Sequence, residues 1–502
     1  MAAENYVTTQ KHVTTENMWQ QKRYCLKKEA YMEKKAGRRC AGCRKENCNG
    51  CSLFNRIQNP KDREVIFPEG FVQDPGQGYG IAFDVGTTTL AALLFDLANR
   101  CQLGALTGVN PGRFAGADVI SRITFAADSE ENRKRLQSTL IRKLDEMAEV
   151  LAEGKEISRV TVAGNTAMCE SILGLGMKGL CRAPFHKEYQ DCCRKKGETL
   201  GFSYLKKAEI LVLPSIDGYV GADALSVYTW VKAMDGRKKV LAVDIGTNGE
   251  ILLFGEGRDF ACSAAAGPAL EGAAVVQGMG AVDGAIKKAA LSGRFPMQDI
   301  ACQVIGGGKA KGICGSGLLS ALSLLVRTGV IDESGCIRSE EELRKMGVPA
   351  RICRRISESR ENGERRILLA GEESQDPVFL TASDIRQLQL AKGAIRAGID
   401  ILLQKAQIPA EELCRIYLTG SFGNSLSAED VTGIGLLPEA GKEKIISVSN
   451  CAGMGAAMAL LSEQVQREME EDAEKICHVE LAGEADFQER FLQEMNFPAA
   501  GR

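Results

Sequence analysis

Residues 80–95 read Gly80-Ile-Ala-Phe-Asp84-Val-Gly86-Thr87-Thr88-Thr89-Leu-Ala-Ala-Leu-Leu-Phe95, and residues 240–254 repeat the pattern. The second stretch reads Val240-Leu-Ala-Val-Asp244-Ile-Gly246-Thr247-Asn248-Gly249-Glu250-Ile-Leu-Leu-Phe254. Each consists of an apolar run, an Asp-x-Gly-Thr segment and a second apolar run, which is the pattern of a β-hairpin with a polar tip. The copies lie too far apart for a solenoid repeat. We therefore predict an α/β protein of two similar lobes with a cleft between them.

The two predicted tips have the chemistry of a polyphosphate site. Glycine lets the backbone approach phosphate oxygens, and tip N–H groups and threonine hydroxyls can donate hydrogen bonds to them. Asp84 and Asp244 end the first strands, where a carboxylate can hold a Mg²⁺-bound water or orient the attacking water, so we predict that both are catalytic. The predicted phosphate-binding residues are Gly86, Thr87, Thr88, Thr89, Gly246, Thr247, Asn248, Gly249 and Glu250.

A third element is predicted to hold the adenosine. Residues 385–403 have a helical apolar period, and Thr381 and Asp384 precede them at capping-box spacing. A predicted strand follows at residues 415–419, and a glycine-containing loop comes directly after it. Glycines let the backbone lie close to a purine and its ribose. The loop residues predicted to bind the nucleotide are Gly420, Ser421, Phe422, Gly423 and Asn424.

Taken in this order, the two hairpins and the glycine loop resemble the actin, sugar-kinase and Hsp70 superfamily, whose lobes are ribonuclease H-like. That resemblance implies an ATP hydrolase that uses ATP and Mg²⁺. Further motifs over residues 78–500 resemble the reductive activators of corrinoid proteins. These motifs are Asn110-Pro111, Gly116-Ala-Asp118-Val-Ile-Ser121-Arg122-Ile123, Ala163-Gly164-Asn165-Thr166-Ala-Met168, Pro214-Ser-Ile-Asp-Gly218-Tyr-Val-Gly221-Ala-Asp223, Gly312-Ile-Cys314-Gly315-Ser316-Gly317-Leu318 and residues 384–398.

The resemblance implies a redox function. Such activators bind a corrinoid protein of a methyltransferase system after its Co(I) has been oxidised to Co(II). They then deliver one electron from an iron–sulfur cluster, supported by ATP hydrolysis. A low-potential electron donor is therefore an expected second partner. The resemblance is compatible with a homodimer. Relatives often carry a plant-type ferredoxin domain, whose cysteine spacing this N-terminal region lacks.

Four cysteines near the N-terminus are predicted to bind a metal. Cys40, Cys43, Cys48 and Cys51 stand in a short segment rich in Lys and Arg. Four clustered thiols in a chain without a secretory signal are typical of a metal site. The short spacer and the need for an electron carrier favour a [4Fe–4S] cluster over zinc, which is the alternative.

Composition bounds the remaining possibilities. A net charge of −2 and 44% hydrophobic residues are ordinary for a globular protein and favour neither nucleic acid nor membrane as a partner. The chain has no long apolar run and no signal peptide, so we expect a cytoplasmic protein. The predicted parts are a Cys-rich segment at 1–58, a linker at 59–79, a middle lobe at 80–235 and a C-terminal lobe at 236–502.

Two other functions fit parts of the sequence. One is an electron-injecting activator like those of 2-hydroxyacyl-CoA dehydratases, which carry one cluster at a dimer interface. The other is a zinc-stabilised ATPase or small-molecule kinase without a redox role. A kinase needs a carboxylate base against the substrate hydroxyl, and Asp217 or Asp223 could serve.

Overall fold

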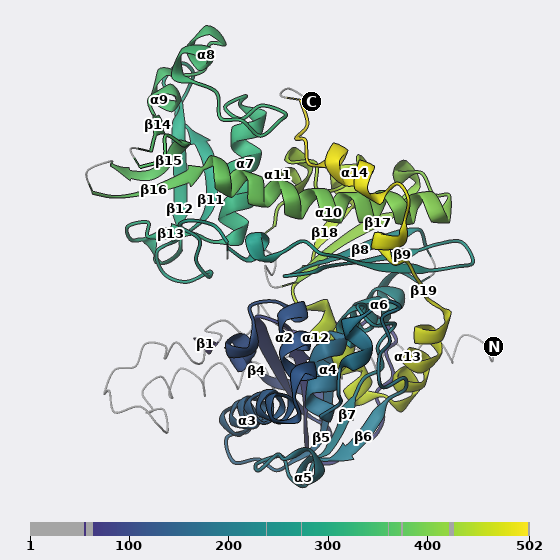
Figure 1. Ribbon diagram of the computed structural model, residues 1–502. Helices are drawn as coiled ribbons and strands as arrows, with labels where there is room; N and C mark the ends of the chain where they lie inside the picture. Colours follow the sequence, from purple (N-terminus) through teal and green to yellow (C-terminus); the bar gives the residue numbers. More distant parts are fainter. Residues whose placement is uncertain are drawn as a thin grey trace, which may run out of the picture.

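The computed structural model describes residues 55–56 and 64–499, except 237, 273, 360, 373–374 and 421–425. The chain forms two lobes, each built around its own sheet and its own apolar core (Figure 1). The predicted cysteine site at residues 40–51 and the loop residues Ser421–Asn424 lie outside the described residues. In the described part of the chain, no helix is long and apolar enough to cross a membrane.

The first lobe has a seven-stranded sheet in the order β1-β4-β3-β2-β5-β7-β6. Its strands are β1 (Asn55–Arg56), β2 (Tyr79–Val85), β3 (Thr89–Asp96), β4 (Cys101–Val109), β5 (Ile157–Gly164), β6 (Cys193–Lys196) and β7 (Glu209–Val212). Its helices are η2 (Pro111–Ala115), α2 (Val119–Asp128), α3 (Glu130–Ala152), α4 (Thr166–Leu173), η3 (Lys178–Cys181), α5 (Gly197–Leu200) and α6 (Ala222–Asp235).

The second lobe has a six-stranded sheet in the order β18-β17-β8-β9-β10-β19. Its strands are β8 (Val240–Ile245), β9 (Gly249–Phe254), β10 (Phe260–Ala264), β17 (Arg415–Gly420), β18 (Ile445–Ser447) and β19 (Cys477–His478). Its helices are η4 (Pro268–Glu271), α7 (Gly315–Arg327), α10 (Ala382–Ala406), η6 (Ala410–Glu412), α11 (Ala428–Gly433), η8 (Lys442–Lys444), η9 (Leu481–Gly483) and α14 (Phe487–Glu494).

Two three-stranded sheets are inserted between β10 and α10. They consist of β11 (Ala285–Ser292), β12 (Asp299–Val304) and β13 (Gly312–Ile313), and of β14 (Ile356–Glu358), β15 (Arg365–Glu372) and β16 (Gln375–Thr381). The short helices η5 (Ile305–Gly307), α8 (Glu340–Lys345) and α9 (Ala350–Cys353) lie in the same part of the chain. Figure 1 shows this insertion standing to one side of the second sheet.

The two large sheets share one topology, which confirms the predicted pair of lobes. In each lobe a hairpin leads into a third antiparallel strand, and two further strands then pair in parallel on the other side of the first strand. Both predicted hairpins are present, with Val85 opposite Leu90 in one and Ile245 opposite Gly249 in the other. The predicted helix is also confirmed as α10, which begins with a capping box between Thr381 and Asp384.

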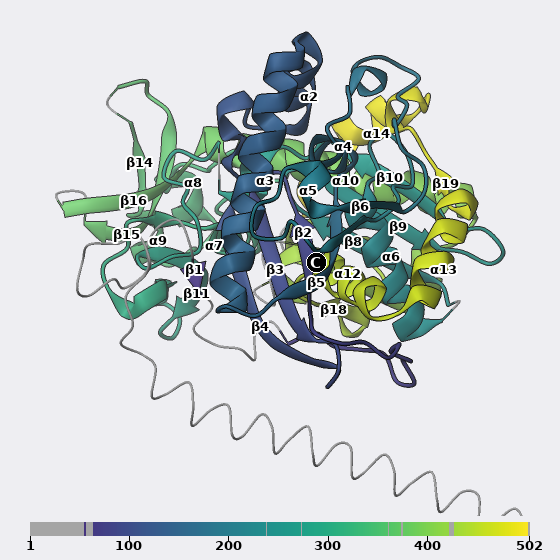
Figure 2. The ribbon, with the colours of Figure 1, turned by 90° about the horizontal axis from the view of Figure 1, so that it is seen from below.

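The chain returns to the first lobe near its C-terminus. Helices α12 (Cys451–Leu461) and α13 (Glu463–Lys475) follow β18 of the second lobe, but their apolar residues belong to the first core. Both views show them beside α6 (Figures 1 and 2). The Thr161 hydroxyl of β5 donates to the carbonyl oxygen of Ala456 at 2.8 Å. The first lobe is therefore completed by residues from the far end of the chain.

The segment before β2 packs along this returning part. Residues 64–78 have no helix or strand. The Trp230 indole N–H donates to the carbonyl of Ile66 at 2.7 Å, and the rings of Phe67 and Phe71 stack with centroids 5.0 Å apart. The Asp74 N–H donates to the carbonyl of Leu461 at 2.8 Å. These contacts fix the entry to the first sheet, and the domain limits proposed from the sequence stay predictions.

We expect Gly455→Ala to destabilise the protein by about 1–3 kcal/mol, because α12 crosses α6 too closely for a side chain. A Cβ atom at Gly455 would stand 2.0 Å from the carbonyl oxygen of Ser226, which belongs to the backbone of α6 and cannot rotate away. The measurement is thermal or urea unfolding. Gly483→Ala is the matched control, since a Cβ there meets nothing within 4 Å. Equal stability of both variants would show that the close approach of α12 and α6 at Gly455 does not require glycine.

Candidate functional site

The tips of the two predicted phosphate hairpins meet between the lobes. The Thr88 hydroxyl of the first lobe lies 3.2 Å from the Thr247 hydroxyl of the second lobe, at hydrogen-bonding distance. Each tip is closed by its own backbone, because Gly86 N–H donates to the Thr89 carbonyl and Gly246 N–H donates to the Asn248 carbonyl, both at 3.0 Å. The structure therefore brings together two sets of residues that the sequence keeps far apart.

Two asparagines hold the first tip in place. The Asn110 amide donates to the Gly86 carbonyl at 2.7 Å, and the Asn165 amide donates to the Thr87 hydroxyl at 3.0 Å. Asn165 also caps α4, since its side-chain oxygen accepts from the Met168 N–H. Both asparagines lie in motifs that the sequence analysis quoted without giving them a role. Their amides fix the backbone and one hydroxyl of the loop that is predicted to face phosphate.

Carboxylates from both lobes converge behind the tips. Burial, followed by the charges of Asp84, Asp223 and Glu271, holds the pKa of Asp244 well above its usual range. Burial also raises the pKa of Glu250, with further contributions from Asp223 and Asp244, and it raises the pKa of Asp223 to about 6. The mutual effects show that these side chains share one electrostatic environment. Asp84 and Asp244, which the sequence predicts to be catalytic, are two of its members.

This donor set suits a cation that is shared with phosphate. Crowded carboxylates with raised pKa values are stabilised when a divalent cation neutralises them. Among the residues that the structure describes, no three acidic, cysteine or histidine side chains are arranged to hold a metal ion by themselves. Magnesium commonly takes only one or two carboxylates and completes its shell with waters and substrate phosphates. The cleft therefore fits Mg²⁺ bound together with a nucleotide.

The start of the predicted adenosine loop lies directly beside this cluster. Strand β17 pairs in parallel with β8, with Thr419 opposite Asp244 and Gly420 opposite Ile245. Gly420 has φ +115°, and a Cβ atom there would meet the Ile245 carbonyl at 2.3 Å and an Asp244 carboxylate oxygen at 2.7 Å. Only glycine permits this approach. The loop thus leaves the sheet at the same edge as the carboxylates.

Comparison with known proteins settles the family. A model described as the C-terminal domain of RACo, the ASKHA domain, matches residues 238–502, and a model of the RACo middle region matches residues 79–235. The chain belongs to the RACo family. The resemblance stated from the sequence motifs is thereby confirmed, and so is the fold of the actin, sugar-kinase and Hsp70 (ASKHA) superfamily.

Two individual proteins are similar to most of this chain. The chain is 32% identical over 434 residues to the corrinoid activation enzyme RamQ of Eubacterium limosum, with 84% of this chain and 70% of that protein covered. It is 27% identical over 454 residues to a [Co(II) methylated amine-specific corrinoid protein] reductase of Methanosarcina barkeri, with 84% and 78% covered.

One solved structure is similar over most of the described chain. It is a reductive activator for corrinoid,iron-sulfur protein, with a TM-score of 0.74 and 31% sequence identity. The match covers 84% of this chain and 66% of that one, so the chain spans just under two thirds of that relative's length.

The structure places the remaining candidate residues in different surroundings. Glu250 lies on β9 directly opposite Asp244. Thr89 is exposed and pairs with Val109 at the start of β3. Asp217, a candidate kinase base, has a carboxylate oxygen at hydrogen-bonding distance, 2.7 Å, from Nδ1 of His478. Burial acts to raise the pKa of Asp217, but the contacts with His478 and the Gly218 N–H outweigh it and lower that pKa.

Sequence reasoning missed Glu271, which contacts both tips. One of its oxygens accepts hydrogen bonds from the Thr88 hydroxyl at 3.0 Å and from the Thr247 hydroxyl at 2.7 Å. The local signal was a proline turn bracketed by glycines, Gly267-Pro-Ala-Leu-Glu271-Gly272. That pattern predicts a rigid turn, but it does not indicate which surface the glutamate reaches.

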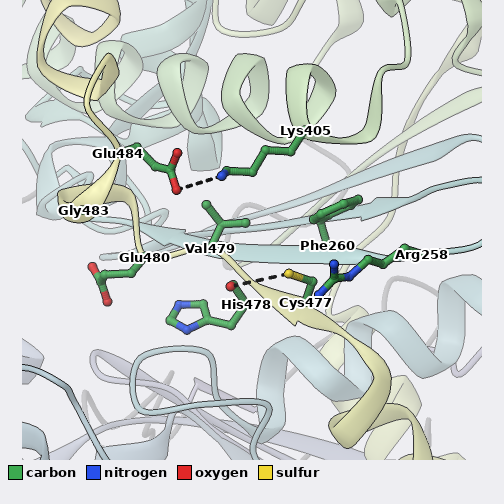
Figure 3. Close-up of a pocket in the computed structure, with 9 residues that line it drawn as sticks. All are labelled: Arg258, Phe260, Lys405, Cys477, His478, Val479, Glu480, Gly483 and Glu484. Carbon is green, nitrogen blue, oxygen red and sulfur yellow. Dashed lines mark hydrogen bonds and ion pairs between the residues drawn. The ribbon is translucent and has the colours of Figure 1, made fainter.

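A separate cavity of about 470 Å³ lies at the edge of the second sheet, beside β19 (Figure 3). It is lined by Arg258, Phe260, Lys405, Cys477, His478, Val479, Glu480, Gly483 and Glu484. Lys405 and Glu484 pair across it at 2.9 Å, so these two charges compensate each other. None of the converging carboxylates of the cleft lines it. This cavity is therefore separate from the predicted nucleotide site.

We expect Asp244→Ala to lower ATP hydrolysis by about 100-fold or more while the fold is kept, because Asp244 stands at the junction of both tips and the adenosine strand. The measurement is phosphate release from Mg-ATP, with circular dichroism to check folding. Asp128→Ala is the control, since Asp128 is an exposed residue at the end of α2. Wild-type hydrolysis by the Asp244 variant would exclude this cleft as the ATPase site.

Proposed function

We propose that this protein is an ATP-dependent reductive activator, which transfers an electron to the Co(II) form of a corrinoid protein of a methyltransferase system. The observation that carries the proposal is the junction of the two phosphate hairpins over a carboxylate cluster, in a chain of the RACo family. Two relatives of the chain bear names that describe corrinoid activation and reduction.

In the cleft, each group has a defined task toward Mg-ATP. The Thr88 and Thr247 hydroxyls and the tip N–H groups donate to the β- and γ-phosphates from opposite lobes. Asp84 and Asp244 would hold magnesium through water or orient the attacking water, and the neighbouring carboxyl groups of Glu250 and Asp223 would favour a cation there. The loop from Gly420 to Asn424 contacts the adenosine. Bound ATP supplies the hydrolysis free energy that drives a change of lobe arrangement.

The electron carrier is proposed to be a [4Fe–4S] cluster on Cys40, Cys43, Cys48 and Cys51, with zinc as the alternative metal. Four thiolates are a complete ligand set for either, and the cluster would supply one-electron redox chemistry. Support comes from β1, which begins four residues after Cys51 and pairs with β4, Asn55 opposite Thr107. Four residues of extended chain span at most about 14 Å. Strand β1 thus joins the sheet of the first lobe a short way along the chain from the proposed cluster ligands.

ATP hydrolysis in the cleft and electron transfer from the proposed cluster need to be coupled, because the electron transfer is thermodynamically unfavourable. For one electron, a deficit of 100 mV corresponds to about 2.3 kcal/mol. ATP can offset this deficit if the lobes take different arrangements with ATP and with ADP, and if the partner binds those arrangements with different affinity. The tips are well placed for this, since Thr88 and Thr247 link the lobes at the point where the phosphates are expected.

The remaining features of the proposal concern partners and setting. Besides the corrinoid protein, a low-potential donor has to reload the cluster. We propose a cytoplasmic location, where reducing conditions keep cysteine thiols available as metal ligands. We assign no role to nucleic acid or membrane, and association of two copies is compatible with the proposal.

The proposal predicts that reduced protein and its corrinoid partner yield little Co(I) without nucleotide and much more with Mg-ATP. The reason is that only hydrolysis offsets the unfavourable potential. The measurement is the visible spectrum of the corrinoid under anaerobic conditions, with a non-hydrolysable ATP analogue as the comparison. Equal Co(I) yield and rate with ATP, with the analogue and with neither would contradict the proposal, and a kinase would become the better assignment.

Cysteine variants separate the two modules in the same assay. Cys43→Ser should lose the metal and the Co(I) yield but keep ATP hydrolysis. Cys336 is an exposed thiol on a surface turn, so Cys336→Ser should change neither the metal content, nor the Co(I) yield, nor ATP hydrolysis. A colourless wild-type protein with stoichiometric zinc would exclude the [4Fe–4S] assignment. Unfolding of the lobes in Cys43→Ser would show that the cysteines are structural.

A further inference from the structure

Glu271 bridges the two lobes through hydroxyls that the nucleotide also needs. A single carboxylate oxygen, Oε2, accepts from Thr88 of the first lobe at 3.0 Å and from Thr247 of the second lobe at 2.7 Å. The two hydroxyl oxygens are themselves 3.2 Å apart. This carboxylate oxygen therefore has the two donors, one from each tip, that the proposed site assigns to phosphate oxygens.

The glutamate is mounted rigidly on the second lobe. It ends the short helix η4, which starts with Pro268 and lies between Gly267 at φ 72° and Gly272 at φ 78°. Ala269 and Leu270 are buried in the second core, and η4 packs against α7 and α10. Its bond to Thr88 is consequently a contact between lobes, whereas its bond to Thr247 lies within one lobe.

A threonine hydroxyl has one hydrogen, so it cannot donate to Glu271 and to a phosphate at the same time. Carboxylate and phosphate oxygens are both strong, charged acceptors, and they repel each other at close range. From this geometry we propose that Glu271 is a built-in competitor of the nucleotide phosphates. Phosphate binding displaces Glu271 from Thr88 and Thr247 and so breaks the lobe-to-lobe bond. The inference rests on the proposed nucleotide site and adds a positioning residue to it.

This competition would make nucleotide binding and lobe arrangement one event. While Glu271 holds Thr88, the tips are fixed to each other through the carboxylate. When the β- and γ-phosphates take the hydroxyls, the lobes are joined through the nucleotide instead, and the length of the phosphate chain sets the new distance. Nucleotides with different phosphate chains would therefore favour different lobe arrangements, each to the extent that it binds one arrangement more tightly than the other. AMP, which lacks these phosphates, cannot compete.

The test compares nucleotide affinity in wild type and Glu271→Gln by calorimetry, with Mg²⁺ present. The amide is neutral and a weaker acceptor, so affinity for ADP and for a non-hydrolysable ATP analogue should rise by about tenfold, equivalent to about 1.4 kcal/mol. Affinity for AMP should not change. Glu256→Gln is the matched control, because Glu256 is an exposed partner of Lys239 outside the cleft. It should leave every affinity unchanged.

A double-variant cycle adds a readout that a merely structural role would not move. In a Thr88→Val background, Glu271→Gln should gain markedly less affinity for ADP, because one of the contested hydroxyls is already gone. Unchanged or weaker binding of ADP by Glu271→Gln, or an equal gain for AMP, would overturn the competition. Wild-type protein that binds no adenine nucleotide at all would instead refute the proposed function, and the inference with it.

Discussion

The contact between Thr88 and Thr247 is the constraint on which the rest of this structure depends. These hydroxyls come from the hairpin tips of different sheets. Their oxygens lie 3.2 Å apart, and one carboxylate oxygen of Glu271 accepts a hydrogen bond from each. Behind them, the carboxyl groups of Asp84, Asp223, Asp244 and Glu250 crowd together, and burial with their mutual repulsion raises the pKa of Asp244 and of Glu250. Such an arrangement is electrostatically unfavourable by itself and favourable around a magnesium-bound polyphosphate. The proposed binding of Mg-ATP would relieve this electrostatic cost.

The fold supplies this junction by using one sheet topology twice and then joining the copies. Each hairpin tip projects from the edge where its central strand ends, so two similar lobes bring two similar tips together. Helix α12 follows the strands of the second lobe in the sequence but packs in the core of the first lobe, so it connects the two lobes. Because Cys451 N–H donates to the Thr419 hydroxyl at 3.0 Å, this crossing is held directly beside the cleft.

Local patterns predicted the parts of the molecule that local physics determines. The apolar runs around Asp84 and Asp244 predicted both hairpins, and the period after Thr381 predicted α10 with its cap. The passage of α12 into the first core was not predictable, because it depends on a close helix contact at Gly455 that has no periodic signature.

Glu271 illustrates the same limit within the site. Its glycine-bracketed turn indicated rigidity, but its two partners lie far away in the sequence, one of them in the other lobe. The supporting amides of Asn110 and Asn165 are also long-range contacts with the first tip. The residues predicted to bind phosphate follow a compact motif, whereas the residues that position this motif come from distant parts of the sequence.

The most direct measurement of the central claim is hydrogen–deuterium exchange at the two tips during titration with a non-hydrolysable Mg-ATP analogue. The peptides of interest cover residues 86–89 and 246–250, and the surface turn at 332–336 serves as the internal reference. If one nucleotide is held from both lobes, exchange should slow at both tips with the same concentration dependence and stay unchanged at the reference. Protection of one tip alone, or of neither, would contradict a site shared between the lobes.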